Sequence, residues 1–320
     1  MKFFNLVLFL SMLVPGKQAS GPGESVILPP ASTETSLIIL GTVQDAGSPQ
    51  IGCKKDCCKN LFLHPDKNRK VVSLGLIDPK NNKKFLFEAT PDMPAQLRTL
   101  YSFSPGSEKE TPDAIFLTHA HIGHYTGLMY FGKEAMNASS IPIYAMPRMK
   151  TFLEQNGPWS QLLTNKNILI EGMSDEKEIQ LTPNLKITPF TVPHRDEFSE
   201  TVGYRITGPG KTALFIPDID KWEKWKTNII EAIAKVDYAF IDGTFYDAAE
   251  INNRDISEIP HPFIIESMKL FKDLAPAEKK KVYFIHFNHT NPLLNKKSRQ
   301  ATEVMKNGFN IAAINDIIKL

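Results

Sequence analysis

The sequence predicts a layered α/β fold, in which strands and helices form separate layers around a shared core. Short apolar runs rich in β-branched and aromatic residues recur from Leu37 onward, and amphipathic stretches of helical period lie between them. The composition is that of a globular protein, with 320 residues of which 42% are hydrophobic and 22% charged. No internal repeat at a solenoid period is visible, so an extended repeat architecture is excluded.

The N-terminal segment has the three parts of a cleaved secretory signal. Lys2 is positively charged, Phe3–Val14 is an almost unbroken apolar run, and the small residues Ala19 and Ser20 follow. The apolar run is shorter than the roughly 20 residues that a membrane-spanning helix needs. We therefore expect a signal peptide over residues 1–20, a linker over 21–35, and a secreted or periplasmic protein without a membrane anchor.

Predicted strands and helices alternate along the rest of the chain. The expected strands are 37–43, 71–77, 85–88, 114–118, 185–192, 213–216, 238–241 and 282–286. The expected helices are 93–100, 124–131, 149–154, 222–235, 263–272 and 297–306. Since no change of composition divides this part of the chain, we expect one domain over residues 36–320.

The charge balance bears on the partners. The formal net charge is only +2, and the two short lysine runs, 279–281 and 296–297, are typical of solvated surfaces. This gives no electrostatic reason to expect a nucleic-acid partner. A small-molecule substrate is therefore expected, and a homodimer is left open.

Three of the eight histidines, His119, His121 and His124, lie close together in the chain. The apolar, β-branched run before them predicts a buried strand, so they lie at the carboxyl end of a strand, where α/β folds place their sites. Imidazole is the commonest metal ligand near neutral pH, and alternate histidines in a turn can converge on one ion. The cluster is therefore interpreted as a metal site.

The segment THAHIGH at 118–124 resembles the HxHxDH signature of the metallo-β-lactamase superfamily. Further segments resemble those of this family in the same order: VPH at 192–194 followed by a strand at 202–206, LFIPD at 214–218, IDGTF at 241–245 and YFIH at 283–286. IDGTF is similar to the EATF segment of the tRNase Z branch. GTVQDAGSPQ at 41–50 and IHFNHTNP at 285–292 resemble the pyrroloquinoline quinone biosynthesis protein B family.

The resemblance implies a fold and a metal site. The fold would be an αβ/βα four-layer sandwich with two mixed β-sheets. His119, His121 and His194 would hold one metal, and Asp218 would bridge to a second metal held by His124 and His286. The resemblance implies Zn²⁺, one or two ions, and Mn²⁺ or Fe²⁺ could take its place.

Gly123 departs from the family pattern, because it stands where the family has an aspartate that binds the second metal. The second site is therefore expected to be weak or completed by another residue, and Gly123→Asp is expected to strengthen it. His289 and His261 are the candidate substitutes, and both are candidate catalytic residues beside Asp218. His289 could instead donate a proton to the leaving group or be an ordinary loop residue. His261 could contact the substrate or be an ordinary loop histidine. Asp45 could also face the pocket, although one aspartate in a turn is usually a turn residue.

All three cysteines, Cys53, Cys57 and Cys58, lie in one short segment. They could bind a structural zinc or form one disulfide, and both alternatives stay open. The phosphodiesterase branch related to PhnP has a zinc-binding CxCxxC cluster, but Lys55 replaces its middle cysteine here. His64 is an alternative fourth ligand, with a surface position as its default.

The activity implied by the resemblance is hydrolysis of a phosphodiester, or of an ester or lactone, through a metal-bound hydroxide. The first alternative is an iron-dependent oxidative enzyme resembling the quinone-biosynthesis family. The second is a non-catalytic metal- or ligand-binding protein of the same fold.

Overall fold

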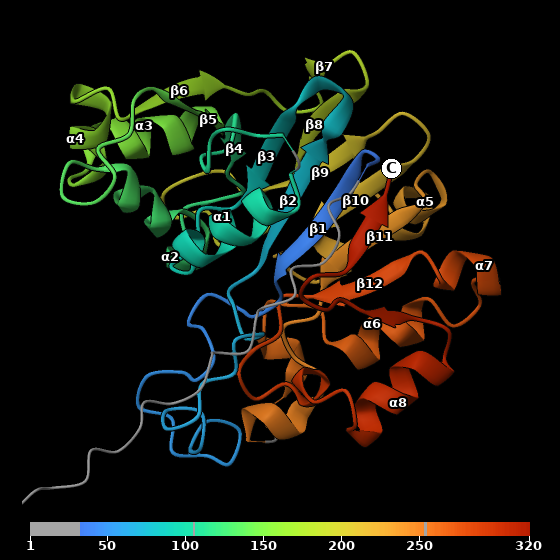
Figure 1. Ribbon diagram of the computed structural model, residues 1–320. Coiled ribbons are helices and arrows are strands. Elements are labelled where there is room, and N and C mark those ends of the chain that lie inside the picture. The colour runs from blue at the N-terminus through green and yellow to red at the C-terminus, as the bar shows by residue number, and fades with distance from the viewer. Residues whose placement is uncertain (1–32, 105, 253–254) are drawn as a thin grey trace, which may run out of the picture.

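The structure is a computed structural model that describes residues 33–104, 106–252 and 255–320 (Figure 1). The expected signal peptide, and the expected linker up to residue 32, lie outside the described residues. Within the described ranges, no helix is both long enough and apolar enough to cross a membrane.

Two mixed sheets form the centre of the described part of the chain, with seven strands in each. The first sheet has the order β14 (Ile317–Lys319), β1 (Ser36–Gly41), β2 (Ser73–Asp78), β3 (Lys83–Phe87), β4 (Ala114–Phe116), β5 (Ile141–Ala145) and β6 (Ile168–Gly172). The second has the order β13 (Asn310–Ile311), β12 (Val282–Ile285), β11 (Tyr238–Asp242), β10 (Thr212–Ile216), β9 (Val202–Thr207), β8 (Leu185–Thr191) and β7 (Ile179–Thr182). In each sheet, antiparallel pairing on one side gives way to parallel pairing on the other.

Helices cover the outer face of each sheet (Figure 1). On the first sheet they are α1 (Met93–Ser102), α2 (Ile122–Tyr125), α3 (Pro147–Gln155) and α4 (Trp159–Thr164). Beside the second sheet lie α5 (Ile229–Ala234), α6 (Ile264–Leu270), α7 (Pro276–Lys279) and α8 (Arg299–Lys306). Short 3-10 helices occupy the connections: η1 (Pro79–Asn81), η2 (Thr126–Phe131), η3 (Trp222–Lys224), η4 (Ala248–Ile251), η5 (Ile256–Glu258) and η6 (Pro292–Leu294). The fold is therefore the αβ/βα sandwich expected from the sequence.

A cluster of aromatic rings lies in the apolar core between the sheets. The Phe87 ring on β3 lies 5.1 Å from Phe116 on β4, and 5.3 Å and 6.1 Å from Tyr204 and Phe215 of the second sheet. Leu86, between Phe85 and Phe87, faces the helices instead. Both faces of these strands are buried, which explains why their sequences are continuous apolar runs without alternation.

The eight predicted strands all form, with ends that differ by at most a few residues. Two predicted helices are wrong in part. Residues 124–131 are mostly the 3-10 helix η2, and residues 222–235 are interrupted, because the Asn228 side chain accepts a hydrogen bond from Ile230 N–H and begins the new helix α5. Strands β5, β6, β7, β13 and β14, and helices α4 and α7, were not predicted.

The strand directions place the chemistry at one edge of the sandwich. Strands β1, β3 and β4 run in the same direction, as do β8, β10, β11 and β12. Most histidines of the predicted metal site follow the carboxyl ends of these strands. The exception is His124, which lies in the short helix α2. Since α2 begins directly after His121, it stays at the same edge.

Candidate metal centre

Three groups of side chains that could bind a metal share Asp218: a group of Asp218, Asp242 and His261, and two groups of four residues each. One is His119, His121, His194 and Asp218; the other is Asp45, His124, Asp218 and His286. Within each group, the donor atoms lie within 4.8 Å of one another. We call the residues of the two groups of four together the histidine–aspartate centre.

Asp218 lies in the middle of this centre. Its Oδ2 atom is 3.2 Å from His194 Nε2, 3.4 Å from His119 Nε2, and 4.0 Å from ring nitrogens of His121, His124 and His286. Asp218 follows β10 and is only 2% exposed. The five histidines that the sequence predicted as metal ligands therefore surround one oxygen of Asp218, the sixth predicted ligand.

The second ring nitrogen of several histidines has its own polar partner. The Thr244 hydroxyl donates its proton to Asp242 Oδ1, so at 2.8 Å it accepts a hydrogen bond from His286 Nδ1–H. This leaves His286 Nε2 as a lone pair that faces the centre. Metal-binding histidines characteristically donate their other N–H to such partners.

Two of the other histidines have a similar partner. His119 Nδ1 lies 2.8 Å from the Thr118 hydroxyl, and His194 Nδ1 lies 3.3 Å from Asp220 Oδ1. His124 Nδ1 lies 3.4 Å from the fully buried Glu88. His194 Nε2 is buried without a hydrogen-bond partner. This set of imidazole and carboxylate donors fits Zn²⁺, which binds through the nitrogen and oxygen atoms of these groups.

Neighbouring histidines hold two carboxylates of the centre in their charged form. Burial alone would raise the pKa of Asp218, but His194, His261 and His286 lower it well below its usual value. Burial would likewise raise the pKa of Asp45, but His124 and His286 lower it well below the ordinary value. Both carboxylates are therefore ionised, as metal ligands must be.

His261 lies beside the centre and outside its two groups. Its Nδ1 atom is 3.1 Å from Asp218 Oδ1 and 2.9 Å from Asp242 Oδ2. Burial would lower the pKa of His261, but Asp218 and Asp242 raise it well above its usual value. The sequence singled out His261 as a possible substitute ligand or substrate contact, and the structure places it against Asp218.

His289 lies elsewhere. Its donor atom groups with Cys53, Cys57 and Cys58, within 4.8 Å of theirs. The sulfur of Cys57 is 3.9 Å from that of Cys53 and 3.7 Å from that of Cys58, too far for a disulfide bond of about 2.05 Å. The structure therefore has three free thiols and one imidazole in a group suited to tetrahedral zinc, while His64 is exposed and outside it.

Sequence reasoning assigned no role to several residues of this site. Glu88 follows β3 and adopts a left-handed φ of 73°, an uncommon conformation for a side-chain-bearing residue. Asp220 and Thr244 orient histidines, and Asp45 was interpreted mainly as a turn residue. The available signal for Glu88 was a charged residue directly after a continuous apolar strand.

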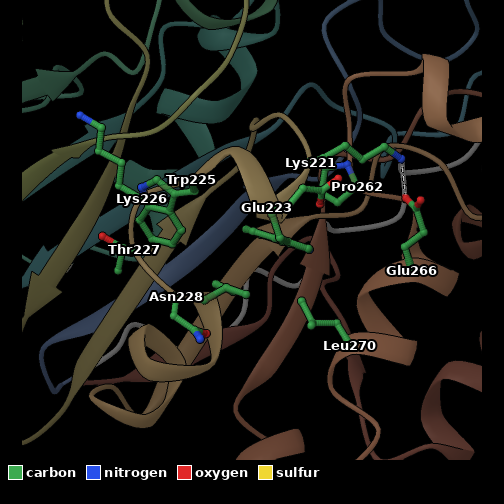
Figure 2. A pocket seen from close by; sticks show the side chains of 11 residues that line it. Lys221, Glu223, Trp225, Lys226, Thr227, Asn228, Pro262, Glu266 and Leu270 are labelled. Carbon is green, nitrogen blue, oxygen red and sulfur yellow. Dashed lines mark hydrogen bonds and ion pairs between the residues drawn. The ribbon is translucent and has the colours of Figure 1, made fainter.

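A separate pocket contains none of the residues of the histidine–aspartate centre. It has a volume of about 410 Å³ and includes Lys221, Trp225, Lys226 and Glu266 in its lining. Figure 2 shows the ion pair between Lys221 and Glu266 at one side of it. The donor groups of the histidine–aspartate centre therefore lie outside this pocket.

Comparison with protein families identifies the superfamily of the chain. Residues 83–287 match the family described as the beta-lactamase superfamily domain. The coenzyme PQQ synthesis protein B of Methylorubrum extorquens strain PA1 is 22% identical over 297 residues, which cover 86% of this chain and 97% of that protein. Its counterpart in Pseudomonas putida strain KT2440 is 24% identical over 302 residues, which cover 86% and 96%.

Solved structures show the same fold. Zinc-bound PqqB from Methylobacterium extorquens superposes with a TM-score of 0.73 at 21% identity. The superposition covers 89% of this chain and 100% of that one. A diphosphatase of the PhnP family gives 0.60 at 20% identity, covering 90% and 99%. The short form of human tRNase Z gives 0.54 at 14% identity, covering 89% and 98%.

Proposed function

Because the chain belongs to the beta-lactamase superfamily domain family, we propose that its histidine–aspartate centre is the active site of a metal-dependent hydrolase. The substrate class we propose is a small-molecule phosphodiester, or a carboxylic ester or lactone. The observation that carries the proposal is the pair of donor groups that share Asp218. Two divalent ions in such a site would act as Lewis acids and lower the pKa of bound water toward about 7.

The protein's own residues have separable roles in this proposal. Asp218 holds the two donor groups together, and the Thr244 hydroxyl fixes which nitrogen of His286 faces the centre. The two carboxylates at His261 Nδ1 orient that ring, so that Nε2 is left to exchange a proton with the leaving group. His261 is 12% exposed, which keeps it within reach of a substrate.

The substrate test begins with phosphodiesters, because two proteins of similar fold are named as a diphosphatase and a tRNase Z. Protein loaded with Zn²⁺ or Mn²⁺ is assayed against phosphodiester, carboxylic ester and lactone substrates, with and without O₂. We expect metal-dependent turnover of at least one class in the absence of O₂. Full metal occupancy with no turnover of any class would contradict the proposal.

A second candidate is an iron-dependent oxidative enzyme. The observation that favours it is the full-length similarity to proteins named coenzyme PQQ synthesis protein B. Iron retained through purification, with turnover that requires O₂, would favour this candidate over hydrolysis.

We further propose that Cys53, Cys57, Cys58 and His289 hold a structural zinc. The basis is the position of three sulfurs and one imidazole within 4.8 Å of one another. Burial, together with the neighbouring thiols, raises the pKa of Cys57 to about 12. A bound zinc would lower this pKa by stabilising the thiolate.

Export is also a proposal, based on the charged, apolar and small-residue order of residues 1–20. N-terminal sequencing of the protein secreted or released from the periplasm tests it. A mature protein that begins after about residue 20 supports export, and an intact Met1 in a cytoplasmic fraction contradicts it.

A further inference from the structure

We infer that Asp45 is the carboxylate ligand of the second metal, and that it takes the place of the aspartate missing at position 123. The inference rests on the proposed metal centre and names a ligand that the sequence pattern does not. The Asp45 Oδ1 atom lies 2.7 Å from His124 Nε2 and 3.3 Å from His286 Nε2. It therefore lies between the two histidines that would hold the second ion.

The space around Gly123 shows that the two positions exclude one another. A Cβ atom at position 123 would lie 2.4 Å from the Cα atom of Asp45, and 2.8 Å from its Cβ and Oδ1 atoms. Side chains do not approach backbone atoms this closely, so position 123 must be glycine while Asp45 stays in place. The carboxylate of Asp45 fills the volume into which a side chain at 123 would project.

The backbone of the Asp45 segment is held on both sides. Gln44 N–H donates to Phe287 O at 2.8 Å, and Phe287 N–H donates to Thr42 O at 2.7 Å, which ties the segment to the second sheet. Val43 N–H donates to Lys70 O at 3.0 Å, and Val72 N–H donates to Val43 O at 2.8 Å. Because the segment is anchored to both sheets, Asp45 is fixed, and its side chain is only 10% exposed.

This arrangement corrects the expectation that Gly123→Asp strengthens the second site. The backbone at Gly123 is not in the left-handed region, so its dihedral angles would accept a side chain. The obstacle is the backbone of Asp45, which a new Cβ would push away from His124 and His286. The substitution therefore removes a ligand while it adds one.

The test counts metal ions in the whole protein with Mn²⁺, which prefers oxygen and nitrogen donors to the cysteine group. Wild type, Asp45→Asn, Gly123→Ala and Gly123→Asp are titrated by calorimetry, and electron paramagnetic resonance reports whether two ions are magnetically coupled. The matched controls are Asp273→Asn, at a carboxylate that is 89% exposed, and Gly172→Ala, where a Cβ meets no atom within 4 Å. Thermal melting of each variant without metal checks that it is folded.

We expect two coupled ions in wild type and in both controls. Asp45→Asn and Gly123→Ala should each lower the affinity for the second ion by at least about 100-fold and abolish the magnetic coupling. Changes around metal ligands typically lower the affinity by about 10- to 100-fold. Gly123→Ala matters because it removes no ligand and acts through the contact of the new Cβ with Asp45. It also carries the test if Asp45→Asn does not fold.

Several results would overturn the inference. They are a second ion bound to Asp45→Asn within about threefold of wild type, stronger binding in Gly123→Asp, or a single ion in wild type. A wild type that binds one ion leaves the proposed hydrolase standing, whereas a wild type that binds no ion contradicts the proposed function itself.

Discussion

Replacing Glu250 with glutamine should change how the stability of this protein depends on pH. Glu250 accepts hydrogen bonds from Tyr246 N–H and, at 2.7 Å, from the Thr290 hydroxyl. Burial disfavours the charged form and raises the pKa of Glu250 from 4.5 to about 7. At about 1.4 kcal/mol per pH unit, the difference corresponds to about 3 kcal/mol.

The sign follows from the proton that the folded protein holds and the unfolded chain releases. Below pH 4.5 Glu250 is protonated in both the folded and the unfolded state, so its carboxyl group does not lower the free energy of unfolding. As the pH rises toward 7, the unfolded chain ionises first, so the free energy of unfolding decreases. Above that window the full destabilisation is present. Glutamine cannot ionise, so Glu250→Gln should match wild type at pH 4 and be more stable at pH 8 by up to about 3 kcal/mol.

Urea unfolding of both proteins across pH 4 to 8 measures the difference directly, because the free energy of unfolding is obtained at each pH. Glu134→Gln is the control, since Glu134 is exposed and its substitution should leave the pH profile unchanged. A difference between Glu250→Gln and wild type that is the same at every pH would refute the reasoning.

The other predictions concern the two metal groups. His121→Ala should remove most metal from the histidine–aspartate centre and abolish turnover while the fold persists, as metal analysis and circular dichroism would show; full metal content with full activity would contradict it. Cys58→Ser should lower the zinc content by one ion per chain and reduce the melting temperature, because zinc binding is linked to folding; an unchanged zinc count would argue against a structural zinc. His289→Ala should cause the same loss of zinc and leave Mn²⁺ binding at the histidine–aspartate centre intact; a loss of that Mn²⁺ instead would show that His289 serves the catalytic metals.

Much of the fold was predictable because buried strands carry a local signal. The run Phe85–Phe87 is apolar on both faces, and His119, His121 and His124 directly follow another such run. The edge strands β6 and β7 could not be predicted in this way, because most of their residues are exposed or half-buried. A strand with few buried positions lacks the apolar pattern on which prediction depends.

For Asp45, the sequence could raise a place in the pocket but could not choose it over a turn residue, and the reason is different. Asp45 and Gly123 are far apart in sequence, and their contact depends on backbone hydrogen bonds from the Asp45 segment to Phe287 and Lys70. A local motif cannot show that a glycine leaves space for the side chain of a residue far away in the sequence. The same holds for His289. It lies near the cysteines only because the segments that follow β1 and β12 pair with each other.

The central claim is that metal in the histidine–aspartate centre produces hydrolysis. The most direct measurement is the rate of phosphodiester and ester cleavage by chelator-stripped protein as Zn²⁺ or Mn²⁺ is added back in oxygen-free buffer. We predict no turnover in the stripped protein, a rate that rises with occupancy of the centre, and no such rise for His121→Ala. A centre filled with metal that cleaves none of these substrates, or that turns over only with iron and O₂, would contradict the account.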